Sequence, residues 1–116
     1  MSTTIVGWGK AIPKKVRSNA EIASMVDTTD EWIFSRTGIR ERRIATEGET
    51  TFTLGRDAAE RALTQARISA ADVDMVIVAT LTPEMPMPAT ASLIQDAIGA
   101  SRAGAFDLNA ACTGFA

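Results

Sequence analysis

The sequence predicts an α/β fold in which helices cover a partly parallel sheet. Two apolar runs, at residues 73–80 and 103–108, have the composition of strands buried inside a sheet. Residues 52–67 and 89–98 carry apolar side chains at three- and four-residue spacing, which is the period of a helix with one buried face. Because strands and helices alternate along the chain, we expect layers of helix and sheet with some strands parallel.

The first forty residues are expected to hold one strand and two short helices. Residues 3–9 are β-branched and apolar, and they predict the first strand. Ser18 and Asn19 are placed to cap a helix over residues 20–26, since a side-chain oxygen there can accept from a free N–H group of the first turn. In residues 28–31 a threonine precedes a glutamate by three positions, which predicts a capping box at the start of a second helix. Gly38 is expected to end that helix.

Charged and proline-rich stretches predict the connections. The basic residues within 14–17 indicate an exposed loop, and residues 39–44 indicate a basic turn or a short extended segment. Thr50 or Thr51 is placed to cap the long helix. Three prolines within residues 83–88 exclude a helix or a central strand there.

Composition limits the classes of function. Twelve basic and fourteen acidic residues give a net charge of −2, which argues against a nucleic-acid partner. A single cysteine allows no internal disulfide, and no stretch is apolar and long enough to cross a membrane. With no secretory signal visible, a cytoplasmic location is expected. The sequence holds no linker or repeat, so residues 1–116 are interpreted as a continuous part of one domain.

Cys112 is the strongest candidate for chemistry. It is the only cysteine, and it lies in a turn of small residues directly after the predicted strand at 103–108. Its neighbours Ala111, Thr113 and Gly114 leave room around the sulfur. A helix beginning at Cys112 would favour the thiolate, which is the nucleophilic form. The alternative is an inert buried thiol, because free cysteine is among the most buried residue types.

The chain contains no histidine. A cysteine nucleophile usually works with a base or proton donor, most often a histidine. Either Cys112 is not catalytic, or the rest of its site lies on polypeptide outside this sequence.

Other candidates keep two interpretations each. Trp32 and Arg36 stand one helical turn apart and could hold a flat ring, or the arginine stem could cover a half-buried tryptophan. The arginines of residues 36–43 could bind phosphates or an acidic partner, or form a solvated face. Met85 and Met87 could line an adaptable apolar tunnel or fill a gap in the core.

Three sequence blocks occur in a fixed order. They are residues 27–33 (DTTDEWI), residues 36–42 (RTGIRER) and residues 105–115 (AFDLNAACTGF). In this order and spacing they resemble β-ketoacyl-acyl carrier protein synthase III, a family of condensing enzymes that start fatty acid synthesis. The resemblance runs from Ile5 to Ala116. It implies a thiolase-like layered αβαβα fold, of which this chain supplies part of the amino-terminal half.

The resemblance also implies a ping-pong reaction. The cysteine matching Cys112 takes an acyl group from acyl-coenzyme A, and malonyl-acyl carrier protein then loses carbon dioxide and attacks the thioester. The residues matching Trp32 and Arg36 sandwich the adenine of coenzyme A, and the one matching Thr28 bonds to it. Met87 falls where the family has an apolar residue that limits the acyl pocket. No permanently bound cofactor and no metal are implied.

The same resemblance implies partners. The family acts as a homodimer, and its catalytic histidine and asparagine lie beyond residue 116. The remainder of the synthase chain is therefore an expected partner, and this polypeptide alone is expected to be inactive in condensation. Two alternatives stay open: a related polyketide or quinolone starter enzyme, and a non-catalytic fragment that binds coenzyme A. No nucleic acid or membrane partner is expected.

Overall fold

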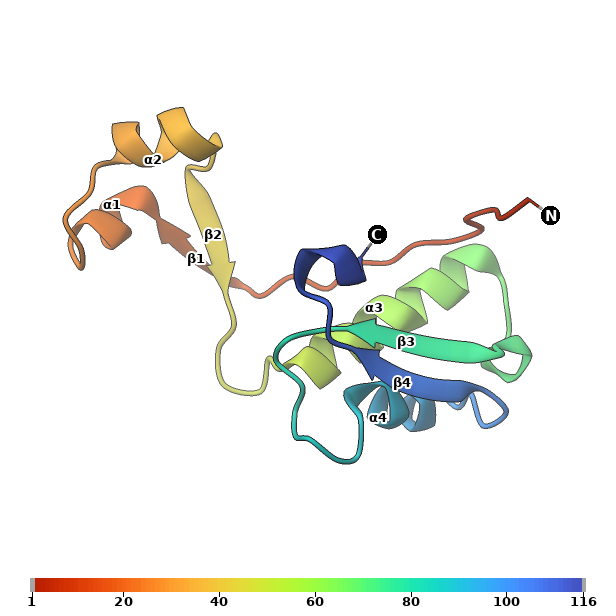
Figure 1. Ribbon diagram of the computed structural model, residues 1–116. Helices are drawn as coiled ribbons and strands as arrows, with labels where there is room; N and C mark the ends of the chain where they lie inside the picture. Colours follow the sequence, from red (N-terminus) through yellow and green to blue (C-terminus); the bar gives the residue numbers. More distant parts are fainter. Residues whose placement is uncertain (1, 116) are drawn as a thin grey trace. The chain divides into compact units, whose positions relative to one another are not determined.

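The computed structural model describes residues 2–115, which form two compact units (Figure 1). The larger unit comprises Met1–Ala11 together with Thr50–Ala116, and the smaller unit comprises Ile12–Glu49. Helices and strands alternate in both, so the α/β class is confirmed. The expectation of one partial domain over residues 1–116 stays a prediction.

The larger unit is built on a pair of parallel strands. Strand β3 (Met75–Ala79) pairs with β4 (Gly104–Leu108), and Ile77 lies opposite Phe106. Helix α4 (Thr90–Ala97) connects them and packs against both strands, as Figure 1 shows. A parallel pair needs such a crossover, because the chain must return to the same edge before the second strand starts. The two strands and this helix are confirmed.

Helix α3 (Thr51–Ala66) packs on α4 at a glycine. A Cβ atom on Gly55 would lie 2.6 Å from Cδ1 of Ile94, so only glycine lets the two helices approach this closely. Ile94 is itself buried. The helix begins where the sequence predicts, since the hydroxyl of Thr50 accepts from the N–H of Thr53.

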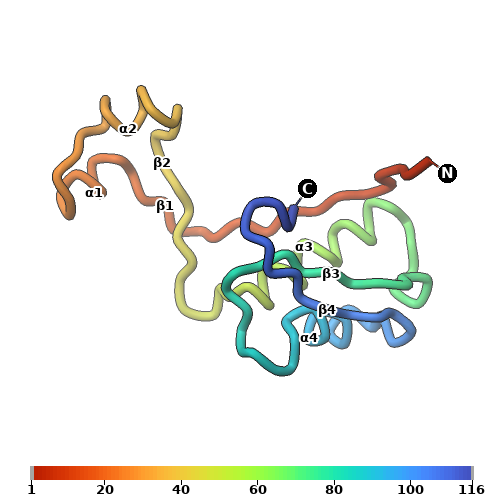
Figure 2. The backbone as a smooth tube through the Cα atoms, in the orientation of Figure 1, coloured from red at the N-terminus to blue at the C-terminus, as the bar shows by residue number. Residues whose placement is uncertain are grey.

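The amino-terminal segment is extended but forms no strand, so the strand predicted at residues 3–9 is wrong. Its backbone lies along α3, a course that can be followed in Figure 2. A Cβ atom on Gly7 would come within 2.7 Å of Ala62 and Ala66. The N–H of Trp8 donates to the side chain of Gln65. The segment thus packs against α3, with its glycines facing alanines of the helix. Because the backbone groups of a helix are already bonded within the helix, the segment cannot form strand hydrogen bonds with it.

Strand β3 was expected to be buried on both faces, and this is wrong for the part of the chain that the structure describes. Val76 and Val78 are partly buried, while Met75 and Ile77 are 51% and 54% exposed. Successive side chains of a strand point to opposite faces. One face is therefore uncovered, although its side chains are as apolar as those of the covered face.

The smaller unit pairs two strands that are antiparallel. Strand β1 (Lys15–Ser18) lies beside β2 (Glu41–Ile44), with helices α1 (Asn19–Ala23) and α2 (Asp30–Thr37) between them in sequence. The extended segment expected within residues 39–44 is confirmed, and the loop expected at 14–17 is wrong. Lysine and arginine lower local strand propensity. Here the pairing with β2, distant in sequence, decides the conformation.

Both short helices begin with a hydroxyl cap. Ser18 and Glu21 form a capping box at α1, and the hydrogen bonds from Ser18 hold the pKa of the Glu21 carboxyl below its ordinary value. At α2 the cap is Thr29, whose Oγ1 accepts from the N–H of Trp32 at 3.1 Å. The capping box predicted one residue earlier is wrong, because the third helical residue is then a tryptophan. Gly38 ends α2 with φ 70, as expected.

Candidate functional site

Cys112 lies in a single turn directly after β4. The turn is the 3₁₀ helix η2 (Ala111–Gly114), and the thiol is exposed. The interpretation of Cys112 as an inert buried thiol is therefore wrong. A Cβ atom on Gly114 would lie 3.3 Å from the side chain of Ala79 and 3.6 Å from the carbonyl of Leu108. The turn thus packs against the carboxyl ends of both parallel strands.

The turn differs from the expected helix start in one respect. The 3₁₀ turn has its first residue at Ala111, whose φ of 48 lies in the left-handed region, and not at Cys112. The Thr113 hydroxyl donates to the carbonyl of Ala110 at 2.6 Å and holds the turn closed. Cys112 is thus presented on a bend whose preceding residue is in the left-handed region, a conformation that costs energy for a residue with a side chain.

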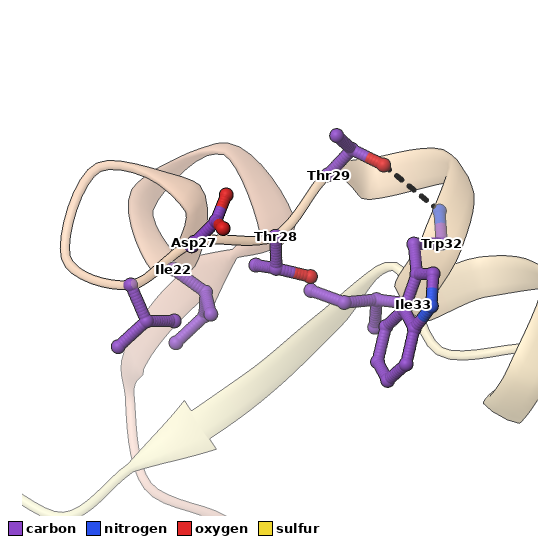
Figure 3. A pocket seen from close by; sticks show the side chains of 7 residues that line it. Ile22, Asp27, Thr28, Thr29, Trp32 and Ile33 are labelled. Atoms are coloured by element: carbon purple, nitrogen blue, oxygen red, sulfur yellow. Dashed lines mark hydrogen bonds between the residues drawn. The ribbon is translucent and has the colours of Figure 1, made fainter.

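A pocket of about 540 Å³ lies in the smaller unit, between α1 and the start of α2. Figure 3 shows its side chains, which are mainly apolar with one carboxylate and two hydroxyls among them. The lining residues are Ile22, Val26, Asp27, Thr28, Thr29, Trp32 and Ile33. An apolar hollow with a few polar groups is the usual form of a small-molecule site.

Thr28 gives this pocket an unused polar group. Its Oγ1 is buried and has no hydrogen-bond partner. In Figure 3 it lies beside the side chains of Trp32 and Ile33. A buried hydroxyl without a partner costs roughly 1–3 kcal/mol, and a ligand that bonds to it recovers part of that cost.

Trp32 and Arg36 come together on one face of α2. The guanidinium carbon of Arg36 lies 5.7 Å from the centre of the Trp32 ring, within range of a cation–π contact. The indole is 58% exposed, so it is not the half-buried tryptophan of the second interpretation. A flat apolar face and a planar cation are both open to a ring-shaped ligand.

Met87 lies in the larger unit, in the connection between β3 and α4. Its side chain is 84% exposed, so it does not fill a gap in the core. The connection itself is held at Glu84. The N–H of Glu84 donates to the hydroxyl of Thr90, and its carboxylate accepts from the N–H of Phe52 at 2.7 Å.

The structure groups three of the five predicted site residues. Thr28, Trp32 and Arg36 belong to the smaller unit, and Cys112 and Met87 belong to the larger one. Among residues 2–115, no cluster of histidine, cysteine, aspartate and glutamate could hold a metal ion. No helix in that range is long and apolar enough to cross a membrane.

Two polar residues that support these sites were missed by sequence reasoning. Asn19 is 1% exposed and makes four hydrogen bonds. The carboxylate of Asp107 accepts from the N–H groups of Thr90 and Ala91 at the start of α4. For Asp107 a signal existed, because Ala89 precedes that helix and offers no capping side chain. For Asn19 no local signal distinguishes a buried amide from an ordinary helix start.

Relatives of the chain were found by sequence. No protein-family model matches it. Over 111 residues, which are 96% of the chain, it is 56% identical to the β-ketoacyl-[acyl-carrier-protein] synthase III of Roseiflexus sp. (strain RS-1), of which it covers 34%. It is 54% identical to the protein of the same name from Xylella fastidiosa (strain Temecula1), again covering 34%. The chain therefore spans about a third of the length of these curated relatives.

Solved structures agree. The crystal structure of 3-oxoacyl-[acyl-carrier-protein] synthase III from Aquifex aeolicus VF5 matches with a TM-score of 0.93 and 47% identity, over 98% of this chain and 37% of that one. The priming β-ketosynthase of the R1128 polyketide pathway matches with a TM-score of 0.92 and 43% identity, over 96% and 33%. The thiolase-like fold is confirmed. By sequence and by fold, the chain matches the amino-terminal third of β-ketoacyl-[acyl-carrier-protein] synthase III.

Proposed function

We propose that this chain supplies the nucleophile and the coenzyme A pocket of a synthase that starts fatty acid synthesis. One observation carries the proposal. The exposed thiol of Cys112 sits on a strained turn at the carboxyl end of β4, in a chain 56% identical to a β-ketoacyl-[acyl-carrier-protein] synthase III. Nothing else in the chain could act as a cysteine nucleophile, because it has one cysteine.

In the first half-reaction, Sγ of Cys112 attacks the carbonyl carbon of acyl-coenzyme A. The bond from that carbon to the sulfur of coenzyme A breaks, a thioester forms on Cys112, and coenzyme A leaves as a thiolate that takes up a proton. A thiolate suits both roles, since it is a good nucleophile and a good leaving group. The backbone N–H of Cys112 would stabilise the negative charge on the carbonyl oxygen.

In the second half-reaction, malonyl-acyl carrier protein loses carbon dioxide. The resulting carbanion attacks the thioester carbon, β-ketoacyl-acyl carrier protein forms, and the thiolate of Cys112 is regenerated. This chain has no histidine to stabilise the carbanion. We therefore expect condensation to require groups outside residues 1–116, with the chain inactive by itself. A homodimer with Met87 at the end of the acyl pocket completes the proposal.

The pocket of the smaller unit is assigned to the adenine of acyl-coenzyme A. The exposed indole of Trp32 offers a face for stacking, and Arg36 adds a cation that can pair with phosphate or stack on the ring. The unpartnered hydroxyl of Thr28 supplies a hydrogen bond to a ring nitrogen or amine. These three groups match the chemistry of a purine: an aromatic plane with polar atoms at its edge.

A second candidate is a starter enzyme of a polyketide pathway. The priming β-ketosynthase of the R1128 pathway has a TM-score of 0.92 and 43% identity. Such an enzyme would use the same cysteine and the same pocket with a different acyl group. The two candidates differ in the preferred donor and not in the first half-reaction.

The test uses the protein expressed from its complete reading frame. Radiolabelled acetyl-coenzyme A should label the protein, and peptide mapping should place the label on Cys112. The Cys112→Ala variant should take up no label, and label that persists in this variant would refute the assignment. Comparing acetyl-, branched- and long-chain coenzyme A donors then separates the two candidates, because a fatty acid starter enzyme should prefer a short donor.

A further inference from the structure

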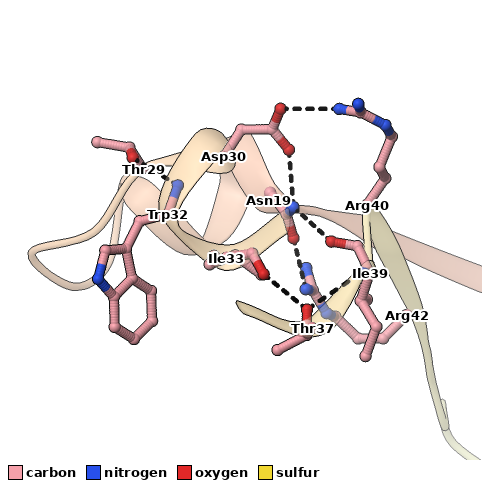
Figure 4. A network of polar contacts seen from close by, with 9 residues as sticks. All are labelled: Asn19, Thr29, Asp30, Trp32, Ile33, Thr37, Ile39, Arg40 and Arg42. Carbon is pink, nitrogen blue, oxygen red and sulfur yellow. Dashed lines mark hydrogen bonds and ion pairs between the residues drawn. The ribbon is translucent and has the colours of Figure 1, made fainter. Parts of the chain in front are cut away.

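A buried amide joins the elements around the pocket. Asn19, the first residue of α1, is 1% exposed. Figure 4 shows its side chain at the centre of a network: Nδ2 donates to Oδ1 of Asp30 at 2.7 Å and to the carbonyl of Ile39 at 2.8 Å. Its Oδ1 accepts from Nη2 of Arg42 at 2.5 Å. Its backbone N–H donates to the carbonyl of Arg40 at 3.1 Å. Both amide hydrogens and the oxygen are therefore satisfied.

These bonds reach both ends of α2. Asp30 is the first residue of that helix, and Ile39 follows the glycine that ends it. The pocket lies between the same two helices: Ile22, one turn after Asn19, lines it from α1, and Trp32 lines it from α2. The amide of Asn19 therefore links the two helices between which the pocket lies.

The other side-chain partner of Asp30 lies in water. Asp30 also pairs with Arg40 at 3.1 Å, but their side chains are 51% and 63% exposed. An exposed ion pair contributes little, because water competes for both charges. A hydrogen bond shielded from water holds its geometry more tightly. The rigid part of the link is thus the buried amide.

We propose that Asn19 is a positioning residue for nucleotide recognition. Its carboxamide fixes the spacing of α1 and α2, and hence the distance across the pocket between Ile22 on α1 and Trp32 on α2. This inference rests on the proposed function, in which that pocket takes the adenine of acyl-coenzyme A. Without the amide, a bound nucleotide has to order the two walls itself, and that ordering subtracts from its affinity.

Two acyl donors test the proposal in the protein expressed from its complete reading frame. Acetyl-coenzyme A carries the nucleotide, and S-acetyl-N-acetylcysteamine carries the same thioester without it. In the Asn19→Ala variant, KM for acetyl-coenzyme A should rise about tenfold with kcat almost unchanged, as expected for losing one buried hydrogen-bonded group. The rate of Cys112 acylation by the short donor should stay that of the wild type.

Two further variants complete the design. Ser24→Ala removes an exposed hydrogen bond at the end of α1 and should change neither donor's kinetics. Asp30→Ala removes one partner of the amide at an exposed site, and should raise KM for acetyl-coenzyme A in the same direction by a smaller factor. If Asn19→Ala does not fold, the Asp30→Ala variant tests the positioning role in its place.

Three outcomes would contradict the inference. An unchanged KM for acetyl-coenzyme A in the Asn19 and Asp30 variants would show that the amide does not position the pocket. An equal loss with both donors would show that Asn19 supports folding in general. A wild-type protein that uses both donors equally well would refute the nucleotide pocket of the proposed function, and the positioning role would fall with it.

Discussion

At the scale of single residues, two adjacent threonines differ in whether their hydroxyls are hydrogen-bonded within the chain. Thr29 caps α2 through its hydroxyl, which accepts from the N–H of Trp32. Thr28 has a buried hydroxyl with no partner. A polar atom that is buried without a bond lowers stability, so its presence indicates a use outside the folded chain itself.

The Thr28→Val variant should show this division. Valine keeps the shape and removes the hydroxyl, so the free energy of unfolding should stay the same or rise slightly. The dissociation constant for coenzyme A should increase about three- to tenfold, the loss of one neutral hydrogen bond. Urea unfolding and calorimetry with coenzyme A, both on the protein from its complete reading frame, measure the two quantities.

The neighbouring Thr29→Val variant is the matched control. It removes the cap of α2, so unfolding should become easier by about 1 kcal/mol. A Thr28→Val protein that loses stability while binding coenzyme A as well as the wild type would contradict the assignment of this hydroxyl to the ligand.

At the scale of elements, the start of helix α4 is capped by a side chain of strand β4. Ala89 has no side chain to bond the first N–H groups of this helix. Asp107 on β4 accepts from Thr90 at 2.8 Å and from Ala91 at 2.7 Å. A carboxylate at a helix amino terminus also interacts favourably with the helix dipole. Because the turn with Cys112 follows β4, this cap ties the helix to the strand that leads to the proposed nucleophile.

Replacing Asp107 should therefore destabilise the protein. Asp107→Ala removes both bonds from partly buried N–H groups, and the free energy of unfolding should fall by about 1–3 kcal/mol. Asp107→Asn keeps one acceptor oxygen and should lose less. Urea unfolding of the protein from its complete reading frame measures both.

An aspartate on the same helix provides the comparison. Asp96 is exposed in the last turn of α4, where a negative charge faces the negative end of the dipole. Asp96→Ala should leave stability unchanged or raise it slightly. Equal losses of stability in the two alanine variants would show that the loss comes from removing an aspartate in general and not from removing the cap.

Local signals in the sequence were sufficient for most of the helices. The start of α3 at Thr50, the stop of α2 at Gly38 and the chain path after β4 all follow from side chains within a few residues. Pairing between distant segments was not predictable in this way. Strand β1 exists because β2 lies beside it, and residues 3–9 are not a strand because they lie on α3.

The site shows the same division. Cys112 could be identified from its turn of small residues, and Trp32 with Arg36 from helical spacing. Asn19 and Asp107 act across 10 to 20 residues of sequence, so no short window contains both partners. The candidate site residues were therefore predictable from local patterns, whereas the partners of Asn19 and Asp107 were not.

At the scale of the whole molecule, the parallel pair of β3 and β4 has one apolar face that no other part of the described chain covers. Met75 and Ile77 of β3 and Phe106 and Leu108 of β4 are between 37% and 54% exposed. The register places Ile77 directly opposite Phe106, so these side chains form one continuous apolar surface. Such a surface costs free energy in water and promotes association.

Replacing Ile77 with threonine should accordingly be favourable in the 116-residue chain and unfavourable in a longer protein that covers this face. In a polypeptide of residues 1–116, threonine makes the exposed face more polar, so binding of the dye ANS and aggregation should both decrease. In a protein of the length of the curated relatives, of which this chain covers 34%, the same change should destabilise by about 1–3 kcal/mol if the face is covered there. Ile68→Thr, at a residue 38% exposed outside this face, should produce no such reversal. Equal stability of wild type and Ile77→Thr in the longer protein would mean that this face stays open to water there as well.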